Sequence, residues 1–526
     1  MFLLHCGAGA RGSGPGQAHC SVNLITVTTS NPVPEAADTS EQMRIRAEKR
    51  ARLIDRGDEA YPVGVERTSS LKEVREKFGH LQADEASGET VGVTGRVVFI
   101  RNTGKLCFAT LQEGNGTRLQ AMLSLAVVGE ESLADWKSLV DLGDIVFIRG
   151  EVISSRRGEL SVMAQSWSMA SKALRPLPVL HAGLNEETRV RQRYVDLMVR
   201  DEARDMVYNR AAIIRGVRDT LHGHGYVEVE TPMLQLVHGG AAARPFETHL
   251  NAFDQKMTLR IATELYLKRA VVGGIERVFE IGRIFRNEGV DSTHSPEFTT
   301  LECYEAYADQ YVMADRMKEI ILHCADLMGS RQIETAAGTI DLDGEWRWLS
   351  VYPGLSEAVG TEITPDTDAA QLREIADKHN VKVDPKWDAE KLVIELFGEI
   401  VEPTLLQPTF VYDYPPSAQP LARPNRDDPR LIEAWDLIIG GMERGTAFSE
   451  LIDPVIQRER LTEQSRLAAN GDDEAMALDE DFLRALEYGA PPMGGIGLGI
   501  DRLVMLFTNT GIRETILFPL LKPEMG

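Results

Sequence analysis

The pattern of apolar and polar positions divides the chain into an unpatterned start and two patterned regions. Residues 1–42 are rich in Gly, Ala, Ser, Thr and Pro without periodicity, which predicts a disordered N-terminal tail. Residues 91–170 contain short alternating runs separated by glycines, and alternation is typical of half-buried strands. From residue 205 onward, amphipathic helical stretches are interleaved with strand-like runs, a pattern that favours an α+β fold.

The alternating region has the plan of an OB-fold barrel. A helical stretch at residues 131–142 separates the third and fourth of five expected strands. Those strands are expected at residues 91–100, 105–112, 118–124, 144–153 and 160–169. Barrels with this order of elements bind oligonucleotides by stacking and hydrogen bonding on their second and third strands. We therefore expect an OB-fold domain over residues 91–178, ended by the stiff segment LRPLP.

Three side chains are candidates for RNA contacts on this barrel. Phe108 on the second strand could stack on a base, and Gln120 on the third strand could bond to a base edge. Arg101 lies near both in the sequence pattern. The alternative interpretation places Phe108 in the barrel core, where an aromatic residue on a strand is common.

Two segments beside the barrel are rich in basic residues. Residues 43–90 are expected to form a helical arm, whose first helix at residues 43–56 is mostly basic. Such charge runs are commonly solvated faces, and an accessory phosphate contact is the functional alternative. Residues 179–204 are interpreted as an arginine-rich linker to the next domain.

Residues 285–304, FRNEGVDSTHSPEFTTLECY, predict two strands joined by a polar loop. Because side chains alternate along a strand, one face of this hairpin carries several polar and aromatic residues. They are Arg286, Glu288, Phe298, Glu302 and Tyr304. A hairpin with one solvated face commonly carries charges, so this stretch alone does not distinguish a binding site from a surface.

A glycine row near the C-terminus predicts a second part of the same site. Residues 494–502, GGIGLGIDR, repeat glycine with period two, which gives a strand with one bare face for a flat ring. Arg502 precedes an apolar helix, and a guanidinium there can bind phosphate or stack on a base. The spacing does not fit a dinucleotide-binding βαβ unit, which requires G-x-G-x-x-G.

A triphosphate site without a P-loop follows from these charges, since the chain has no GxxxxGK[ST] sequence. Arg286, His294 and Arg502 supply cations for the phosphates, and Phe298 could pair with Arg502 around an adenine. Asp436 and Glu443 are carboxylates of the kind that bind Mg²⁺ bridging two phosphates.

Composition narrows the cellular setting. A net charge of −23 opposes non-specific RNA binding, so an RNA contact needs a local basic patch. The five cysteines form no CxxC pair, which fits a reducing compartment and predicts a cytoplasmic protein. The chain also lacks 18 consecutive apolar residues, so no membrane span is expected.

Three stretches, in this order, resemble motifs 1, 2 and 3 of class II aminoacyl-tRNA synthetases: residues 225–234, 285–304 and 494–502. In the first of them, the alternating residues 226–232 predict a strand that ends in proline. The barrel in front is similar to that of the subgroup for lysine, aspartate and asparagine. The resemblance implies an N-terminal five-stranded barrel that binds the anticodon. It also implies a class II catalytic domain over residues 205–526, an antiparallel sheet flanked by helices with a helical insertion around 345–400. Motif 1 of that class implies a homodimer.

Charge points to the amino acid within that subgroup. An aspartate site needs a cation for the side-chain carboxylate, whereas this chain supplies Glu302, Tyr304 and Glu450. Buried acids are costly unless they are paired, and a lysine ammonium offers three donors and no acceptor. The segments GGAAARPF, ATELYLKR and FSEL are similar to signatures of the lysyl-tRNA synthetases. Their substrates are L-lysine, ATP and tRNA(Lys).

The resemblance implies roles for individual side chains, with Arg286 and Arg502 as the catalytic pair. ATP would be bound by Arg286, Glu288, His294, Phe298, Glu443, Gly499 and Arg502. L-Lysine would be bound by Gly240, Glu264, Arg286, Glu302, Tyr304, Phe448 and Glu450. The cofactor Mg²⁺ would be bound by Asp436 and Glu443. The anticodon would be bound by Arg101, Phe108, Gln120 and Glu159.

The chain departs from the family pattern at a few of these positions. Thr446 stands where many relatives have asparagine, and Ile452 also differs from the common ending of that motif. Asp436 is one methylene shorter than the usual glutamate. Thr293 replaces an arginine found in some relatives, which leaves more of the γ-phosphate contact to His294 and Arg502.

Two other functions are compatible with parts of the pattern. A paralogue that attaches lysine to a protein would lack the barrel, and one that attaches lysine to a lipid would carry membrane spans. An RNA-binding module with a decayed synthetase domain would have lost some of Arg286, Glu288 and Arg502, which are all present.

Overall fold

The computed structural model describes residues 41–178, 184–469 and 475–523. The chain forms two compact units, with the boundary between Pro176 and Leu177. Nearly all of the predicted tail lies outside the described residues, but Glu41 already begins the first helix, so the boundary expected at residue 42 is slightly late. Within the described residues, no helix is both long and apolar enough to cross a membrane.

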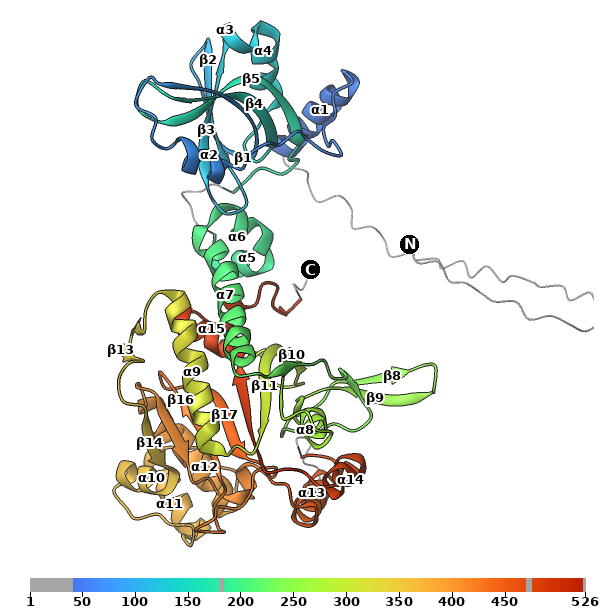
Figure 1. The fold of residues 1–526 in the computed structure, drawn as a ribbon, viewed down its shortest axis with the longest axis vertical. Coiled ribbons are helices and arrows are strands. Elements are labelled where there is room, and N and C mark those ends of the chain that lie inside the picture. Colours follow the sequence, from blue (N-terminus) through green and yellow to red (C-terminus); the bar gives the residue numbers. More distant parts are fainter. Residues whose placement is uncertain (1–40, 179–183, 470–474, 524–526) are drawn as a thin grey trace, which may run out of the picture. The chain divides into compact units, whose positions relative to one another are not determined.

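The first unit is a closed five-stranded barrel with the strand order β1-β2-β3-β5-β4, drawn in blue to green in Figure 1. Its strands are β1 (Ala86–Asn102), β2 (Leu106–Gln112), β3 (Arg118–Ser124), β4 (Ile145–Ser154) and β5 (Leu160–Ser171). Its helices are α1 (Glu41–Asp55), α2 (Leu71–Phe78), α3 (Leu125–Val128) and α4 (Glu130–Leu139). Trp136 of α4 is fully buried against the barrel core. The predicted OB fold is therefore confirmed.

The basic helix α1 packs against the barrel through its own cations. Arg46 is buried and donates hydrogen bonds to two backbone carbonyls, and Lys49 pairs with Asp141 at 2.5 Å. Arg56 pairs with Asp135 at 2.5 Å. These cations hold the helix to the barrel. Neither of the two interpretations made from the sequence, a solvated face or a phosphate contact, included this role.

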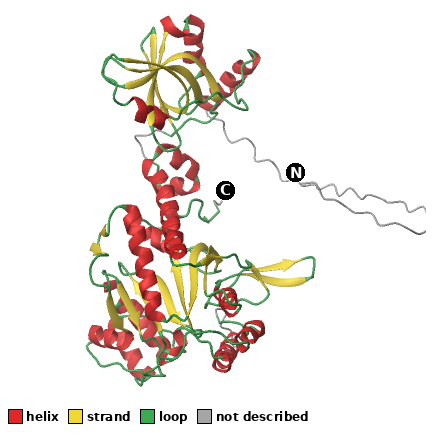
Figure 2. Ribbon diagram, in the orientation of Figure 1, coloured by secondary structure: helices red, strands yellow, loops and turns green. Residues whose placement is uncertain are grey.

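The second unit is built on an eight-stranded sheet with the order β14-β15-β16-β17-β18-β11-β10-β6. In chain order the strands are β6 (Val227–Glu228), β10 (Arg277–Phe285), β11 (Glu297–Ala306), β14 (Arg347–Ser350), β15 (Thr409–Tyr412), β16 (Ala434–Ile438), β17 (Glu443–Ser449) and β18 (Met493–Gly499). Only the two edge pairs, β6 with β10 and β14 with β15, are parallel. The predicted antiparallel sheet flanked by helices is confirmed (Figure 2).

One face of this sheet is covered by three helices: α7 (Asp201–Gly223), α9 (Gln310–Met328) and α15 (Ile500–Thr508). Alternate residues of the central strands, such as Leu301, Cys303, Ile496 and Leu498, point into the core that these helices form. The residues between them on β11 and β18 therefore point to the opposite face, where they are free to build a site.

The remaining elements surround this sheet. The helices are α5 (Glu186–Arg191), α6 (Arg193–Val199), α8 (Glu264–Val272), α10 (Val351–Val359), α11 (Ala369–His379), α12 (Ala389–Ile400), α13 (Pro454–Ala469), α14 (Glu480–Glu487) and α16 (Ile512–Thr515). The short strands are β7 (Leu234–Gln235), β8 (Glu247–Leu250), β9 (Gln255–Leu259), β12 (Gln332–Thr335) and β13 (Gly338–Asp341). Two short 3₁₀ turns lie at Glu402–Thr404 and Pro416–Ala418.

Two segments differ from their predicted structure. The expected linker contains α5 and α6, because buried Arg193 pairs with Asp196 at 2.9 Å and Glu514 at 3.0 Å. The strand expected at residues 226–232 is only two residues long. Beyond it, the backbone N–H of Thr231 donates to the Glu280 carboxylate instead of joining the sheet.

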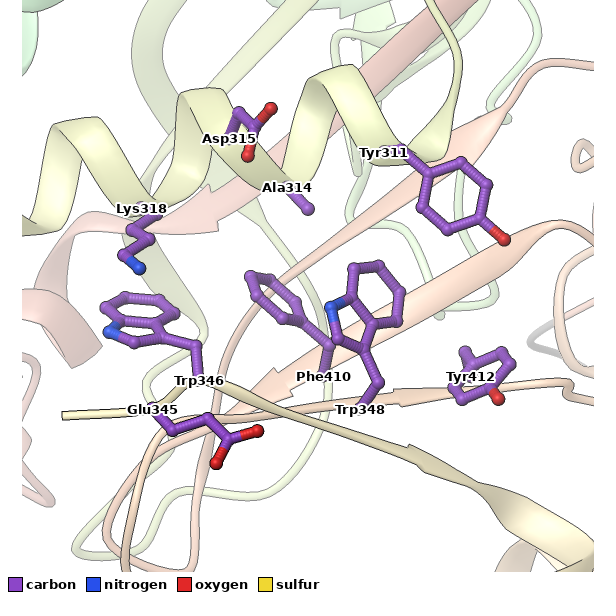
Figure 3. A pocket seen from close by; sticks show the side chains of 9 residues that line it. All are labelled: Tyr311, Ala314, Asp315, Lys318, Glu345, Trp346, Trp348, Phe410 and Tyr412. Atoms are coloured by element: carbon purple, nitrogen blue, oxygen red, sulfur yellow. The ribbon is translucent and has the colours of Figure 1, made fainter.

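A cavity of about 560 Å³ lies between α9 and the β14–β15 edge of the sheet (Figure 3). Its wall is an aromatic group in which Trp348 stacks on Phe410 with ring centroids 4.8 Å apart. Tyr311 and Tyr412 extend this group toward solvent. None of the residues predicted for the catalytic site lines this cavity.

Candidate functional site

A second cavity, of about 420 Å³, lies on the face of the sheet opposite the three helices. Every residue predicted for ATP, lysine and metal lines it. These residues are Gly240, Glu264, Arg286, Glu288, His294, Phe298, Glu302, Tyr304, Asp436, Glu443, Phe448, Glu450, Gly499 and Arg502. Segments separated by more than 200 residues in the sequence thus meet in one site.

The register of the central strands explains this convergence. On β11, Glu302 lies opposite Gly497 of β18, and Tyr304 lies opposite Gly495. Since glycine has no side chain, the polar side chains of β11 stand beside a bare strip of backbone. The period-two glycine row therefore leaves room for a ligand beside the acids of β11.

Arg286 reaches the site from outside the strand that was predicted to carry it. Strand β10 ends at Phe285, and the backbone N–H of Arg286 donates to the Pro296 carbonyl at 2.9 Å. Its guanidinium lies over the Phe298 ring, 5.4 Å from the centroid. Glu288 also lies beyond the strand and is exposed. The first strand therefore ends earlier than predicted, but Arg286 and Glu288 still line the same cavity as Phe298 and the return strand.

Three buried carboxylates, those of Glu264, Glu302 and Glu450, form the end of the cavity at which L-lysine is predicted to bind. Glu302 accepts the backbone N–H of Thr263 at 2.9 Å and lies 3.5 Å from the Tyr304 hydroxyl. Burial is the main reason that the pKa of Glu302 rises to about 7 and that of Glu450 to about 8. Burial also raises the pKa of Glu264. These acids therefore need a cationic partner in order to ionise fully at neutral pH.

The structure also places Lys268, which the sequence interpretation did not include, among these acids. Its Nζ lies 2.6 Å from Glu264 Oε1 and contacts Glu450 Oε2, and its side chain is only 1% exposed. Lys268 follows Glu264 by four residues on α8, a spacing that brings two side chains together on a helix. That spacing was the available sequence signal for this pair.

Gly495 provides space beside the acids. A Cβ atom at this position would overlap Glu450 Oε1 and the Tyr304 ring. Gly240, on the facing loop, has a φ of +89°, which side chains rarely tolerate. Both glycines therefore permit backbone to approach the site where a bulkier residue would fill it.

The other end of the cavity is cationic. Arg502 Nη1 donates to the backbone carbonyl and to Oε2 of Glu443, both at 3.1 Å. Arg444, buried beneath it, donates to the Arg502 carbonyl at 2.9 Å and to the Ile439 carbonyl at 3.0 Å. Arg444 therefore fixes the start of α15, from which the Arg502 side chain extends.

The loop between β10 and β11 presents His294 at the rim of the cavity. Asp291 accepts the backbone N–H groups of Thr293 and His294, and its Oδ2 lies 2.9 Å from His294 Nδ1. These hydrogen bonds lower the pKa of Asp291. The Asp291 carboxylate therefore orients the His294 ring at the rim of the cavity.

Asp436 and Glu443 offer oxygen ligands at the same end. Burial and the nearby Glu443 charge raise the pKa of Asp436 to about 7, while Tyr414 and Thr446 hydrogen-bond to it. No group of three or more His, Cys, Asp or Glu side chains in the described part of the chain is arranged to hold a metal alone. Mg²⁺ commonly uses one or two carboxylates with substrate phosphates, so two mutually repelling carboxylates fit an ion that arrives with ATP.

Thr446 acquires a role from this arrangement. It lies opposite Asp436 in the β16–β17 pair, and the Asp436 carboxylate and the Trp435 carbonyl, at 3.3 Å, share its one hydroxyl proton. Thr446, which departs from the family pattern, therefore orients Asp436, which is shorter than the usual glutamate. Its hydroxyl is engaged with β16, whereas a longer asparagine side chain would reach farther into the cavity.

The four barrel residues predicted for RNA lie on the outside of the barrel. Phe108 is half-buried and Arg101 lies over its ring at 5.0 Å, whereas the neighbouring Cys107 and Ala109 form the core. Gln120 accepts a hydrogen bond from Ser161, and exposed Glu159 pairs with Arg75 at 3.2 Å. The alternative that Phe108 is a core residue is therefore wrong.

Comparisons with known proteins match this architecture. Residues 185–522 match the family described as tRNA synthetases class II (D, K and N), and residues 91–170 match the OB-fold nucleic acid binding domain. The chain is 58% identical to a lysine--tRNA ligase of Kineococcus radiotolerans, over 94% of this chain and 99% of that protein. It is 59% identical to a lysine--tRNA ligase of Mycolicibacterium gilvum, over 92% and 98%.

A longer protein is also similar. The chain is 47% identical to a lysylphosphatidylglycerol biosynthesis bifunctional protein of Mycobacterium ulcerans, over 92% of this chain. The match covers only 44% of that protein. More than half of the longer protein therefore has no counterpart in the aligned part of this chain.

Proposed function

Since the chain belongs to the family of class II tRNA synthetases for aspartate, lysine and asparagine, we propose that it is a lysine-specific member. It activates L-lysine with ATP and transfers the lysine to tRNA(Lys). The relatives that match nearly their whole length are lysine--tRNA ligases, at 58% and 59% identity. The observation that carries the lysine assignment is the charge at the amino-acid end of the cavity.

That charge matches lysine in sign and amount. Glu264, Glu302 and Glu450 supply three negative charges when ionised, and Lys268 and Arg286 supply two positive charges. L-Lysine brings two ammonium groups and one carboxylate, so its net positive charge neutralises the net negative charge of these side chains. Aspartate would instead add a second carboxylate to a buried acidic cluster, which is strongly unfavourable.

The first reaction step needs no protein base. The lysine carboxylate attacks the α-phosphorus of ATP in line, the bond to the β-phosphate oxygen breaks, and pyrophosphate leaves with that electron pair. Positioning and charge stabilisation supply the rate enhancement in such phosphoryl-group chemistry. Arg286 bridges the lysine carboxylate and the α-phosphate, and Arg502 and His294 bind the outer phosphates. Phe298 and the glycine strand ending at Gly499 enclose the adenine, with Glu288 at its edge.

Asp436 and Glu443 would hold the Mg²⁺ that accompanies ATP and neutralises the developing phosphate charge. In the second step, the 3′-terminal hydroxyl of tRNA attacks the carbonyl carbon of lysyl-adenylate, and AMP leaves. Phe448 packs beside the lysine stem, and Gly240 and Glu264 bind its backbone groups. A direct test of the whole reaction is charging of tRNA(Lys) with radiolabelled lysine, and failure with folded enzyme would contradict the proposal.

Two further proposals concern the setting of this reaction. We propose a homodimer formed through α7 and the following segment, where Tyr208, Val227 and Met233 are 56%, 50% and 47% exposed. Exposed apolar groups of this kind are typical of an interface.

We also propose a cytoplasmic location, since translation supplies the tRNA substrate there.

Phe108→Ala should weaken tRNA binding without affecting amino-acid activation. Base stacking on an aromatic side chain contributes about 1–3 kcal/mol, so KM for tRNA(Lys) should rise by roughly 5- to 150-fold. Pyrophosphate exchange, which needs no tRNA, should remain within twofold of wild type. Comparing both assays on one preparation checks this, and a loss of both activities would show that Phe108 supports the barrel instead.

The affinity for lysine should increase as pH rises from about 6 to 8.5. Glu302 and Glu450 have pKa values of about 7 and 8, above the usual 4.5, so the folded protein retains protons that the unfolded chain loses. Without lysine, stability should therefore decline as pH rises through 7 and 8. Added lysine pairs with the ionised acids, so its effect on Tm should grow over the same range. Thermal unfolding with and without lysine at each pH tests this, and a shift independent of pH would contradict it.

A further inference from the structure

Lys268 is a buried cation that the proposed reaction does not use directly. It extends from α8 between Glu264 on the same helix and Glu450 after β17. Its ammonium also lies 5.9 Å from the centroid of the Tyr304 ring. All three neighbours line the cavity proposed for lysine. Lys268 is therefore adjacent to the substrate subsite through its partners.

We propose that Lys268 is a positioning residue that holds the Glu264 and Glu450 carboxylates in place to receive the lysine substrate. This inference rests on the proposed lysine specificity and deepens it. Glu264 and Glu450 come from separate parts of the chain, and Lys268 is their shared partner. Each acid binds Lys268 through one oxygen, which leaves the other oxygen for a substrate ammonium.

The orientation of Glu450 supports this division of its two oxygens. Oε2 contacts Lys268, whereas Oε1 lies on the side of Gly495 and Tyr304, where the cavity is open. Neither oxygen has a well-aligned hydrogen bond within the protein. A buried carboxylate without such a bond is costly, and an incoming ammonium would satisfy it.

A purely stabilising role explains this cluster poorly. Glu264, Glu450 and Lys268 are almost fully buried, with side-chain exposures of 7%, 1% and 1%. Buried ion clusters rarely improve stability over apolar residues of similar size, because desolvation offsets their attraction. Two acids that share one cation cannot both be neutralised by it, so one of them keeps its proton until a second cation arrives and pairs with its negative charge. A cationic substrate would supply that second cation.

The full charge environment determines what removal of Lys268 would do. Glu264 from α8 and Glu450 after β17 contact Lys268, and the Tyr304 ring of β11 lies beside it. Beyond the effect of burial, Glu302 of β11 raises the pKa of Glu450, and Glu264 raises that of Glu302. Arg286 lowers the pKa of Glu302. Without Lys268, the three acids would repel one another in a site of low dielectric. They would then hold protons to higher pH, which weakens their attraction for an ammonium.

Lys268→Met tests this proposal because it removes the charge and nearly keeps the volume. KM for lysine in pyrophosphate exchange should rise at least about tenfold, while KM for ATP stays within twofold. The pH at which lysine binding reaches half its maximum should rise by about one unit. Calorimetry with L-lysine on the full-length protein gives a binding readout that is independent of turnover. Lys268→Gln, which keeps donors without charge, should have a similar but smaller effect.

Arg269→Met is the matched control on the same helix. Arg269 pairs with Asp479 and Asp481 at 2.5 and 2.9 Å, outside the cavity, so its loss should leave KM for lysine within twofold. The proposal is overturned if Lys268→Met keeps the wild-type KM and pH profile. It is also overturned if both Lys268 variants only lose stability or fail to fold. Wild-type protein that showed neither lysine-dependent exchange nor lysine binding would instead contradict the proposed function itself.

Discussion

Arg286→Ala is expected to reduce lysine-dependent pyrophosphate exchange by about 10³-fold or more. Loss of one preorganised group that stabilises transition-state charge commonly costs about 10²–10³-fold in rate. Arg286 would contact both reacting partners, the lysine carboxylate and the α-phosphate, so its loss should lie at or above the upper end of that range. The largest part of the reduction should be in kcat, because the developing charge on the α-phosphate exists only in the transition state, and KM for lysine should rise as well because Arg286 would also bind its carboxylate.

Arg283→Ala is a suitable control for this change. Arg283 lies three residues earlier, within β10, is 40% exposed and lies 3.7 Å from Glu297, and it does not line the cavity. Its loss should leave exchange within about twofold. Comparable exchange rates for the two variants would show that Arg286 does not act on the reacting groups.

Glu450→Gln is expected to raise KM for lysine by roughly 10- to 150-fold. A hydrogen bond to a charged group contributes about 1.5–3 kcal/mol, and the isosteric amide keeps the shape of the site while removing the charge. KM for ATP should remain within about twofold, because the groups proposed for ATP lie at the other end of the cavity. Steady-state exchange with lysine and ATP varied in turn separates the two constants.

A second buried glutamate provides the control for Glu450. Glu433 is 2% exposed and pairs with Arg426 at 2.7 Å, outside the cavity. Glu433→Gln should change stability without a selective effect on lysine. If both variants raised KM for lysine equally, the effect would come from the fold and the assigned role of Glu450 would be wrong.

Much of the site could be predicted from the sequence because many of its residues lie on strands. Period-two alternation placed Phe298, Glu302 and Tyr304 on one face, and the glycine row predicted the bare strand beside them. Both patterns involve only residues close together in the sequence, and β11 and β18 keep the predicted alternation. The residues proposed for ATP and lysine consequently meet in the cavity that these strands line.

The features that sequence interpretation missed depend on contacts between distant segments. Lys268 is significant only because Glu450, about 180 residues later, returns to the same point. The helices in the expected linker are stabilised by Arg193 binding Glu514, a pairing with no local pattern. Arg286 lies just beyond its strand because its backbone partner across the loop is Pro296, which accepts its N–H but has no N–H to donate in return.

If the buried acids select lysine, ATP–pyrophosphate exchange should depend on which amino acid is supplied. The full-length protein would be assayed with L-lysine, L-aspartate or L-asparagine at equal concentration, without tRNA. Rapid exchange is expected with lysine, and only background exchange with the other two amino acids. Exchange supported by aspartate or asparagine, or no exchange with lysine in folded protein that binds ATP, would contradict the proposed selection of lysine.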